Sequence, residues 1–364
     1  MISFSILVGG LTPDVQVSLF NFSSFSGALA LASNTTAFGA SPSFLALSLS
    51  RAFAYAANHG GGDVGATSVA LSWSGPSKLS ARALGHQMTD DPCHIALHPS
   101  GAYVFTASYA NGTATVLPVG ADGAAQPPLR TLALGLNAHQ TVFAGPGGRF
   151  VFVPLLGSDA VAQLVFDAAT GALEANAAGG AVQLPTGSGP RQVAFHPTLP
   201  VAYALCEVSS QVAPLAFDAA AGTLAYAGGA VSTLQDACGA KQPEVQAAAD
   251  VLVSADGRFL YATNRARPFG AGENSVAVFS IDAAGVLHGP IQWATGGAGA
   301  AAAVNFPRHA ALVPFPGEPF LVVANQLGGS IAVFTRDAAT GLLAHVTSAS
   351  SAPTTTPSFV IPLV

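Results

Sequence analysis

One strand-and-turn unit recurs seven times along the 364 residues, and this repetition constrains the fold more than any other feature of the sequence. Most units begin with a short apolar run that leads through a turn rich in Pro, Gly or Asp to a second apolar run. This pattern is typical of an antiparallel hairpin. The seven opening runs are Pro42–Leu47, Pro92–Leu97, His139–Phe143, Pro190–Phe195, Ala249–Val253, Pro307–Leu312 and Pro357–Ile361.

A second recurring turn gives the same count independently. Asp and Gly suit tight turns because Asp bonds to local backbone and Gly accepts positive φ. The spacing of about 50 residues is typical of a four-stranded propeller blade with variable loops. The sequence therefore predicts an all-β, seven-bladed β-propeller with four-stranded antiparallel blades. The turns are Asp167–Leu173, Asp218–Leu224, Asp282–Leu287 and Asp337–Leu343, with looser versions at Asn21–Leu29, Leu71–Leu79 and Ala121–Leu129.

The two ends of the chain complete this prediction. Pro357–Val364 is an opening strand with no strand after it, whereas Met1–Gly10 is an apolar strand with no opening strand before it. The N- and C-terminal strands are therefore expected to share a blade, which closes the ring and leaves no free edge. We interpret Gly228–Ala248 and Gly296–Ala303 as loops rather than linkers, so residues 1–364 are predicted to form a single domain.

Composition excludes several classes of protein. Charged residues make up 8% of the chain, against about 25% in typical domains, and half of the residues are apolar. No apolar run approaches the roughly 18 uninterrupted residues that a membrane span requires. A net charge of −6 with only two lysines argues against a nucleic-acid partner, which requires a basic surface.

The cysteines and the first residues indicate a cellular location. Cys93, Cys206 and Cys238 are odd in number and widely spaced, which suits a reducing compartment better than a disulfide framework. Met1–Gly10 lacks the basic start and the small-residue cleavage site of a signal peptide. We therefore expect a cytoplasmic protein.

The hairpin around His196–Pro200 places two opposite charges together. Its apolar runs Val193–Phe195 and Val201–Leu205 fold back on each other, so residues equally far from the turn become cross-strand neighbours. Arg191 is thereby expected opposite Glu207 at the open end of the hairpin. Because the opening strands of a propeller line its central shaft, this end is expected at the mouth of the shaft.

The same reflection in the other units predicts a polar ring in an otherwise apolar protein. Three of the ten arginines fall on this ring, and Arg suits a bidentate grip on carboxylate or phosphate. The ring is therefore predicted to bind a small anion. The predicted neighbours are His94 with Tyr109, His139 with Pro154 or Leu155, Asp250 with Asn264 and Arg265, Arg308 and His309 with Asn325 and Gln326, and Ser43 with Asn58 and His59.

Six segments together resemble one known family. They are Pro92–Gly101, Ala107–Val116, Gly187–Pro197, Cys206–Val212, Ala248–Arg265 and Val323–Phe334. They resemble the seven-bladed propeller lactonase family, which contains bacterial-type 6-phosphogluconolactonases and fungal 3-carboxy-cis,cis-muconate lactonizing enzymes. The resemblance implies that His139, Arg191, Glu207 and Arg265 stand in the active site. It also implies, less specifically, that His94, Arg308 and Gln326 line the cleft.

Each of these candidates also has a structural explanation. From one hairpin alone, Arg191 and Glu207 would be an ion pair that ties the open end together. His139 stands where other units carry Pro, so a functional imidazole is favoured there. His94 and His309 fit either explanation, whereas His98 and His196 precede Pro in the inner turns and are interpreted as structural, which keeps them out of the site.

The remaining ring residues are expected to act at the rim. Asp250 could orient an arginine rather than react. Tyr109 and Asn111 are expected to bond sugar hydroxyls, although Tyr109 could equally pack between blades. Arg265 is expected to face the ligand, with Arg267 as a solvated neighbour, and the loop Pro268–Glu273 is long enough to reach over the mouth.

The sequence favours a lactonase that hydrolyses an anionic sugar lactone such as 6-phosphoglucono-δ-lactone. Arg191, Arg265 and Arg308 are expected to bind the anion and stabilise the oxyanion, while His139 or Glu207 activates water. A carboxymuconate cycloisomerase and a non-catalytic interaction propeller are the alternatives. Metal-binding and nucleotide-binding motifs and a Gly-x-Ser-x-Gly elbow are absent from the sequence, so neither a metal nor another cofactor is expected. A metal site with ligands gathered from separate blades stays open as an alternative.

A wet channel mouth also predicts the energetics of the central pair. An exposed ion pair contributes no more than about 1 kcal/mol to stability. Substitution of Arg191 or Glu207 is therefore expected to reduce turnover much more than it reduces stability.

Overall fold

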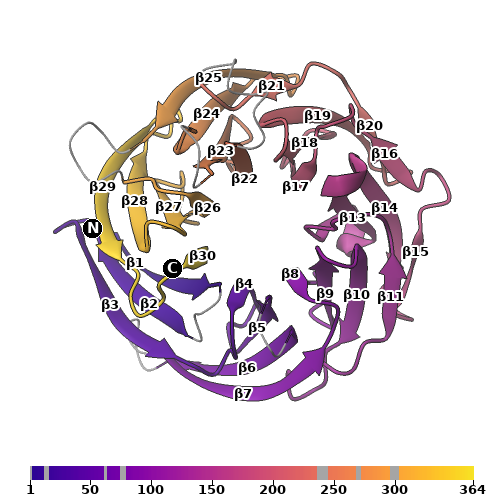
Figure 1. Cartoon of the computed structure of the whole chain (residues 1–364), viewed down its shortest axis with the longest axis horizontal. Coiled ribbons are helices and arrows are strands. Elements are labelled where there is room, and N and C mark those ends of the chain that lie inside the picture. The colour runs from indigo at the N-terminus through magenta and orange to yellow at the C-terminus, as the bar shows by residue number, and fades with distance from the viewer. Residues whose placement is uncertain are drawn as a thin grey trace.

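Seven antiparallel sheets form a closed ring around a central axis (Figure 1). The structure is a computed structural model that describes residues 2–11, 16–60, 64–73, 79–235, 245–267, 272–295 and 303–364. Within these ranges the other regular elements are two short 3-10 helices, η1 (Pro146–Gly148) and η2 (Leu156–Ser158). The predicted all-β, seven-bladed propeller is confirmed.

Each blade contains four strands that run in order from the shaft to the rim. Blade 1 consists of β30 (Pro357–Leu363), β1 (Ser3–Gly10), β2 (Val17–Ser23) and β3 (Ala28–Thr35); blade 2 of β4 (Pro42–Leu47), β5 (Phe53–Asn58), β6 (Gly65–Trp73) and β7 (Leu79–Met88); and blade 3 of β8 (Pro92–Leu97), β9 (Tyr103–Ser108), β10 (Thr113–Pro118) and β11 (Arg130–Ala133).

Blades 4 and 5 each add a short fifth strand that pairs with the third one. Blade 4 consists of β12 (Val142–Ala144), β13 (Phe150–Leu155), β14 (Ala160–Asp167), β15 (Ala172–Ala175) and β16 (Ala181–Gln183); blade 5 of β17 (Pro190–Phe195), β18 (Val201–Cys206), β19 (Gln211–Asp218), β20 (Thr223–Tyr226) and β21 (Val231–Ser232); blade 6 of β22 (Gln246–Val253), β23 (Phe259–Ala266), β24 (Ser275–Ile281) and β25 (Leu287–Ala294); and blade 7 of β26 (Pro307–Leu312), β27 (Phe320–Asn325), β28 (Ser330–Arg336) and β29 (Leu343–Ser350).

The two ends of the chain meet in blade 1, as the sequence predicts. Strand β30 pairs antiparallel with β1, with Leu7 opposite Ile361 and Val8 opposite Val360. Figure 1 shows the yellow C-terminal strand on the inner side of the indigo N-terminal strands. Because β30 is the innermost strand of its blade, this pairing closes the ring at the shaft itself.

The hydrophobic core lies between neighbouring blades. One cluster, for example, joins Val276 and Val278 of β24 to Leu321 and Val323 of β27. Fully buried alanines recur on the second strands, where the blades converge on the axis and leave little room; they include Ala56, Ala57, Ala204, Ala262 and Ala324. The abundant Ala of the sequence therefore serves close packing.

The recurring Asp-Gly turns form as predicted. Asp167, Asp218, Asp282 and Asp337 each accept a hydrogen bond from the backbone N–H two residues further on. Three of the turns at this end also receive a tyrosine from the preceding blade: Tyr55, Tyr203 and Tyr261 donate to the carbonyl groups of Gly123, Gly285 and Gly341 at 3.1, 2.7 and 2.9 Å. The turns thus tie adjacent blades together.

His98 and His196 are held by turn backbone, in agreement with their structural interpretation. In His196, Nδ1 accepts from the N–H groups of Thr198 and Leu199, so Nε2 carries the proton and donates to the carbonyl of Gly257 at 3.0 Å. His98 makes the equivalent contact with the carbonyl of Gly148 at 3.3 Å. Both imidazoles connect one blade to the next.

One predicted loop needs correction. Gly228–Ala248 is not a loop throughout, because it contains β21 and the start of β22. Its middle portion, 236–244 with Cys238, lies outside the described residues, as do 268–271 of the predicted mouth loop and 296–302. Within the described ranges no helix is long and apolar enough to cross a membrane.

Candidate active site

A β-bulge lies at the second residue of the innermost strand in five blades, and further along the innermost strand of blade 6. The register between the first and second strands shifts at Ser43, Cys93, Arg191, Arg308 and Ser358, and across Ala249–Asp250. In blade 4, Ala138 bridges Leu155 ahead of β12, which brings His139 to the corresponding level. A bulge leaves one residue unpaired and redirects its side chain, and such bulges are common next to active sites.

The bulges sort the ring residues into two layers. The mouth layer consists of Ser43, Cys93, His139, Arg191, Ala249, Arg308 and Ser358. The belt layer consists of the residues that follow them in the chain: Phe44, His94, Gln140, Gln192, Asp250, His309 and Phe359. Simple reflection about the hairpin turn does not separate these layers, because it assumes a regular ladder without bulges.

The belt layer connects all seven blades around the shaft. Five of its side chains accept a hydrogen bond from a backbone N–H of the next blade, and the aromatic rings of the other two complete the circuit. The hydrogen bonds join His94 to Thr141 (3.3 Å), Gln140 to Val193 (2.7 Å), Gln192 to Val251 (3.3 Å), Asp250 to Ala310 (2.7 Å) and His309 to Val360 (3.4 Å). The ring centroids lie 3.9 Å apart for Phe359 and Phe44 and 4.2 Å apart for Phe44 and His94.

The belt explains the protonation of its titratable members. His94 and His309 accept through Nδ1, which requires a neutral imidazole, and burial lowers the pKa of each to about 3. Burial likewise raises the pKa of the Asp250 carboxyl to about 7. The sequence suggests all three as ligand contacts, whereas their observed side-chain contacts hold the blades together.

Glu207 is the centre of the charged cluster at the mouth. It follows the last residue of β18, and its carboxylate meets Arg191 Nη1 at 2.5 Å, Arg265 Nη2 at 3.1 Å and Arg267 Nη2 at 3.5 Å. The Arg191 and Glu207 side chains are only 6% and 13% exposed. The predicted contact is therefore present, but the expectation of a wet, exposed ion pair is wrong.

Burial and the three guanidinium groups act in opposite directions on Glu207. Burial alone would raise the pKa of its carboxyl, but Arg265 and Arg191 outweigh this effect and lower that pKa to about 2. Burial also lowers the pKa of Arg265 to about 9, against the influence of Glu207. One carboxylate therefore balances several cations and stays ionised.

Backbone contacts fix the positions of the two buried arginines. Arg191 Nε donates to the carbonyl of Ala249 at 2.7 Å. Arg265, at the end of β23, donates to the carbonyls of Ala247 and Ala248 at 3.3 and 3.2 Å. Its guanidinium also lies 5.2 Å from the centroid of the Phe306 ring. Both guanidinium groups are thus held in place before any ligand binds.

Arg308 occupies a different environment in the same layer. Among the described residues, its guanidinium has one hydrogen-bond acceptor, Gln326 Oε1 at 3.3 Å. Burial and then the nearby charge of Arg191 lower the pKa of Arg308 to about 10. Gln326 follows the last residue of β27, so the predicted pairing of Arg308 with Gln326 is present.

His139 is a buried imidazole with an unused nitrogen. Its side chain is 6% exposed, and Nδ1 has no hydrogen-bond partner among the described residues. Burial, followed by the charges of Arg191 and Arg308, lowers its pKa well below the ordinary value. The imidazole is therefore neutral near pH 7. Tyr109 covers it edge to face, with 5.9 Å between the ring centroids.

The structure moves three predicted neighbours. His94 pairs with Ala107 rather than Tyr109, and His309 pairs with Ala324 rather than Asn325 or Gln326. Asp250 accompanies Thr263, whose hydroxyl contacts its backbone N–H at 3.0 Å, rather than Asn264 or Arg265. Asn111 lies exposed in the turn after β9. Arg267 is no isolated solvated neighbour, since it shares Glu207 even though its side chain is 41% exposed.

Gln140 and Gln192 are the positions that sequence reasoning missed. Both directly follow a mouth residue, and both accept a hydrogen bond from the next blade. Alignment of the seven opening runs by the residue after the bulge would have placed these glutamines beside His94, Asp250 and His309. That signal requires knowledge of the bulge, which the sequence alone does not display.

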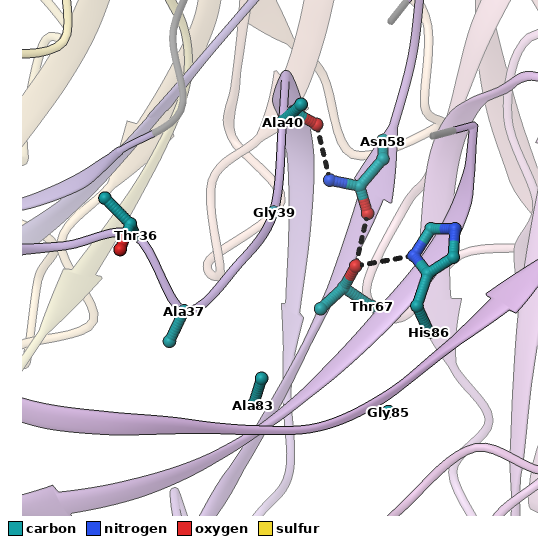
Figure 2. A pocket seen from close by; sticks show the side chains of 9 residues that line it. All are labelled: Thr36, Ala37, Gly39, Ala40, Asn58, Thr67, Ala83, Gly85 and His86. Carbon is teal, nitrogen blue, oxygen red and sulfur yellow. Dashed lines mark hydrogen bonds between the residues drawn. The ribbon is translucent and has the colours of Figure 1, made fainter. Parts of the chain in front are cut away.

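A hollow lies away from the mouth, and its buried polar side chains bond one another. Figure 2 shows it between the segment Thr36–Ala40, Asn58, Thr67 and His86, with a volume of about 480 Å³. Asn58 donates to the carbonyl of Ala40 and accepts from the Thr67 hydroxyl, which also contacts His86 Nδ1 at 2.8 Å. These groups satisfy one another, so the hollow carries no chemistry comparable to that of the mouth.

No metal ligand set can be assigned in the described part of the chain. There, no three His, Cys, Asp or Glu side chains form a group that could hold an ion. The charged groups at the mouth are instead mainly guanidinium groups, which bind anions.

The sequence matches a family model described as "Lactonase, 7-bladed beta-propeller" over residues 5–361. It is 32% identical to the 6-phosphogluconolactonase of Bacillus subtilis (strain 168) over 282 residues, which is 74% of each chain. It is 35% identical to the 6-phosphogluconolactonase of Pectobacterium carotovorum over 174 residues, and this alignment spans only half of that relative.

Solved structures agree with the fold. A Bacteroides fragilis protein superposes with a TM-score of 0.83 at 24% identity and covers 100% of this chain and 98% of its own. The periplasmic gluconolactonase of Pseudomonas aeruginosa superposes with a TM-score of 0.80 at 25% identity, covering 100% and 99% of the two chains.

Proposed function

The chain belongs to the seven-bladed β-propeller lactonase family, and on this premise we propose that it hydrolyses 6-phosphogluconolactone to 6-phosphogluconate at the mouth of the shaft. The observation that carries this proposal is the excess of guanidinium groups around one carboxylate. Arg191, Arg265 and Arg267 share Glu207, and Arg308 stands nearby with a neutral partner. Such a cluster attracts an anionic substrate and an oxyanion.

We assign the role of general base to His139. A base must have a free lone pair and be unprotonated at the working pH. The lowered pKa of His139 keeps the imidazole neutral, so one of its ring nitrogens carries a lone pair, and the buried Nδ1 has no hydrogen-bond partner among the described residues. Glu207 is a poor candidate because three guanidinium groups already occupy its oxygens and its pKa is about 2.

The reaction needs no group beyond water and these side chains. His139 takes a proton from water as the water oxygen bonds to the lactone carbonyl carbon. The carbonyl oxygen becomes an oxyanion, which Arg191 and Arg265 stabilise. When the bond between that carbon and the ring oxygen breaks, the imidazolium returns the proton to the ring oxygen. The product carries a carboxylic acid and a hydroxyl group in place of the lactone. Glu207 takes no part in the bond changes and serves as the fixed counter-charge of the arginines.

The substrate anion is expected to tune this base. In the free protein, burial and the charges of Arg191 and Arg308 both disfavour the imidazolium form of His139. A bound anion offsets those positive charges, so it raises the pKa of His139 toward the working range. The neutral base is thus available in the free enzyme, and the imidazolium becomes accessible only after the substrate has bound.

We also propose that the reaction takes place in the cytoplasm. Cys93 and Cys206 are buried free thiols, which a reducing compartment preserves. One structural relative is described as periplasmic, so fractionation of cells that express the full chain should decide between the two compartments.

One assay tests the proposed activity. Purified protein receives freshly prepared 6-phosphogluconolactone, with and without a chelator, and in parallel 3-carboxy-cis,cis-muconate. Hydrolysis above the buffer rate, unaffected by the chelator, is the expected result. Lactone formation from the muconate alone would assign the cycloisomerase activity instead, and no turnover of either compound would leave a non-catalytic propeller.

A variant tests the assigned base. His139→Gln should lower turnover by roughly a hundredfold to ten-thousandfold, the usual contribution of general acid–base catalysis. His288→Gln is the matched control, because this histidine is 56% exposed on an outer strand. Full activity of His139→Gln would overturn the assignment.

A further inference from the structure

Arg308 is the mouth arginine whose hydrogen-bonding capacity is least used. A guanidinium has five N–H donors, and among the described residues Arg308 meets a single acceptor, Gln326 Oε1 at 3.3 Å. Part of its surface remains accessible. Arg191 and Arg265, by contrast, each contact Glu207 as well as backbone carbonyl groups.

The electrostatic environment of Arg308 also favours the binding of an anion. Burial and the charge of Arg191 both lower its pKa, to about 10. The carboxylate of Glu207 contacts the other three arginines within 3.5 Å and leaves Arg308 without a carboxylate in contact among the described residues. A bound dianion would relieve this imbalance more than a neutral hydroxyl group would.

We propose that Arg308, with Gln326 as its neutral partner, binds the phosphate of the substrate and so determines the preference for phosphorylated over unphosphorylated sugar lactones. This inference rests on the proposed lactonase function. It assigns the bond-breaking chemistry to His139, Arg191, Arg265 and Glu207, and the recognition of the phosphate to Arg308 and Gln326.

The neutrality of Gln326 is central to this division. An amide oxygen orients Arg308 but leaves its charge uncompensated, whereas a carboxylate at the same place would act as an internal competitor of phosphate. Glu207 shows this effect on the reacting side, where it occupies Arg191, Arg265 and Arg267. Gln326→Glu should therefore close the phosphate site while leaving Arg308 in place.

The experiment compares two substrates that differ only in the phosphate. Arg308→Gln is expected to lower kcat/KM for 6-phosphogluconolactone about thirtyfold, the scale of a lost charge-assisted hydrogen bond. The same variant also removes one of the charges that lower the pKa of His139, so a change in kcat/KM for glucono-δ-lactone is expected as well, but one about tenfold smaller than the loss on the phosphorylated substrate. Gln326→Glu should reproduce this selective loss, and Arg308→Lys, which keeps the charge but loses the planar fork, should lie in between.

Two control variants distinguish a direct contact between Arg308 and the phosphate from a general effect of removing one positive charge. Arg267→Gln removes the same charge from a 41% exposed position at the mouth and should affect both lactones to a similar, smaller extent. Arg82→Gln removes it from the outer strand β7 and should affect neither. Melting curves of all variants show that each is folded before rates are compared.

The outcomes distinguish this inference from the proposed function. An equal loss on both lactones would place Arg308 at the reacting centre, and no loss on either would remove it from the site; both results overturn the inference. If the wild type hydrolyses neither lactone, the proposed function fails. Calorimetric titration with 6-phosphogluconate then still tests the phosphate site, because Arg308→Gln should weaken binding about thirtyfold and equal affinity would overturn it.

Discussion

Each residue of the mouth layer is followed in the chain by a residue of the belt layer, yet the side chains of the two layers make different contacts. Arg191 contacts a shared carboxylate at the opening, whereas Gln192 accepts one hydrogen bond from Val251 of the next blade. His139 has an unused nitrogen, whereas Gln140 is bonded to Val193. At the mouth, His139 and Arg308 keep unused hydrogen-bonding capacity among the described residues, while the polar side chains of the belt are engaged by the next blade.

This difference shows how the propeller separates binding from stability. In six blades the β-bulge sets one residue of the opening strand at the mouth and leaves the next one to bond the neighbouring blade. Some mouth residues also bond the next blade, as Arg191 does with the carbonyl of Ala249, but the circuit of contacts that joins all seven blades belongs to the belt layer. Substitutions in the two layers should have opposite consequences, and the following five experiments test that expectation.

Deletion of 357–364 should have the largest effect, because it removes a member of both layers. Ser358 and Phe359 lie on β30, the innermost strand of blade 1. Its loss exposes the edge of β1 and breaks the belt between His309 and Phe44. We expect an insoluble or much less stable protein. A soluble product with an unchanged melting temperature would contradict ring closure through this strand.

Glu207→Gln should reduce both activity and stability. The change leaves buried guanidinium groups without their carboxylate, and loss of one partner of a buried pair costs roughly 3–5 kcal/mol. Chemical denaturation measures this free energy of unfolding. Glu174→Gln on the exposed face of β15 is the matched control, with an expected change below about 1 kcal/mol. Equal small losses in both variants would restore the exposed-pair interpretation.

Arg191→Gln should reduce catalysis more than it reduces stability. Glu207 keeps Arg265 and Arg267 as partners, so the cluster remains charge-balanced. Loss of an oxyanion contact costs about 2.7–4 kcal/mol of barrier, or a hundredfold to a thousandfold in turnover. Rates per folded molecule on 6-phosphogluconolactone measure the effect. A variant that melts early yet turns over normally would make Arg191 a structural residue.

Gln192→Leu should show the reverse pattern one residue away. It removes one of the two acceptors of the buried Val251 N–H, which keeps Asp250 Oδ1 at 3.0 Å, so the loss of stability should be about 1 kcal/mol, the scale of one ordinary hydrogen bond. Turnover per folded molecule should remain within a few-fold of the wild type, because the substituted side chain does not face the mouth. A loss of turnover as large as that of Arg191→Gln, without a loss of stability, would show that the two layers are not separable.

The smallest effect is expected from exchanging one belt acceptor for another. His94 and His309 have a pKa near 6.5 in the unfolded chain and about 3 in the fold. The unfolded state therefore binds more protons between these values, and stability falls as the pH drops from 6.5 toward 3. His94→Gln and His309→Gln supply an amide oxygen, as Gln140 and Gln192 do. Each should cost about 0.5–1.5 kcal/mol at pH 7 through lost ring contacts.

The acid range provides the test of these two variants. Melting temperatures measured from pH 7 down to pH 4 should fall less steeply for His94→Gln and His309→Gln than for the wild type. Parallel curves for all three proteins would mean that the belt histidines do not titrate with unfolding.

The repeat alone determined the architecture. Seven opening runs and seven later turns predict seven blades, and the unmatched strands at the two ends predict the shared blade of β30 and β1. The prediction succeeds because period-2 apolar runs and Asp-Gly turns are local properties that each blade satisfies by itself. The contact between Arg191 and Glu207 follows from the same logic, since it depends on a single hairpin.

Only the tertiary structure decided which polar residues stand free and which are held. The sequence groups His94, Asp250 and His309 with His139, because all four lie near the start of an opening strand. The bulges separate them, and the backbone N–H groups that occupy three of the four belong to neighbouring blades. Burial of Glu207 among three arginines likewise depends on residues from two blades. Contacts between blades depend on the packing of the whole ring, and no local pattern in the sequence encodes them.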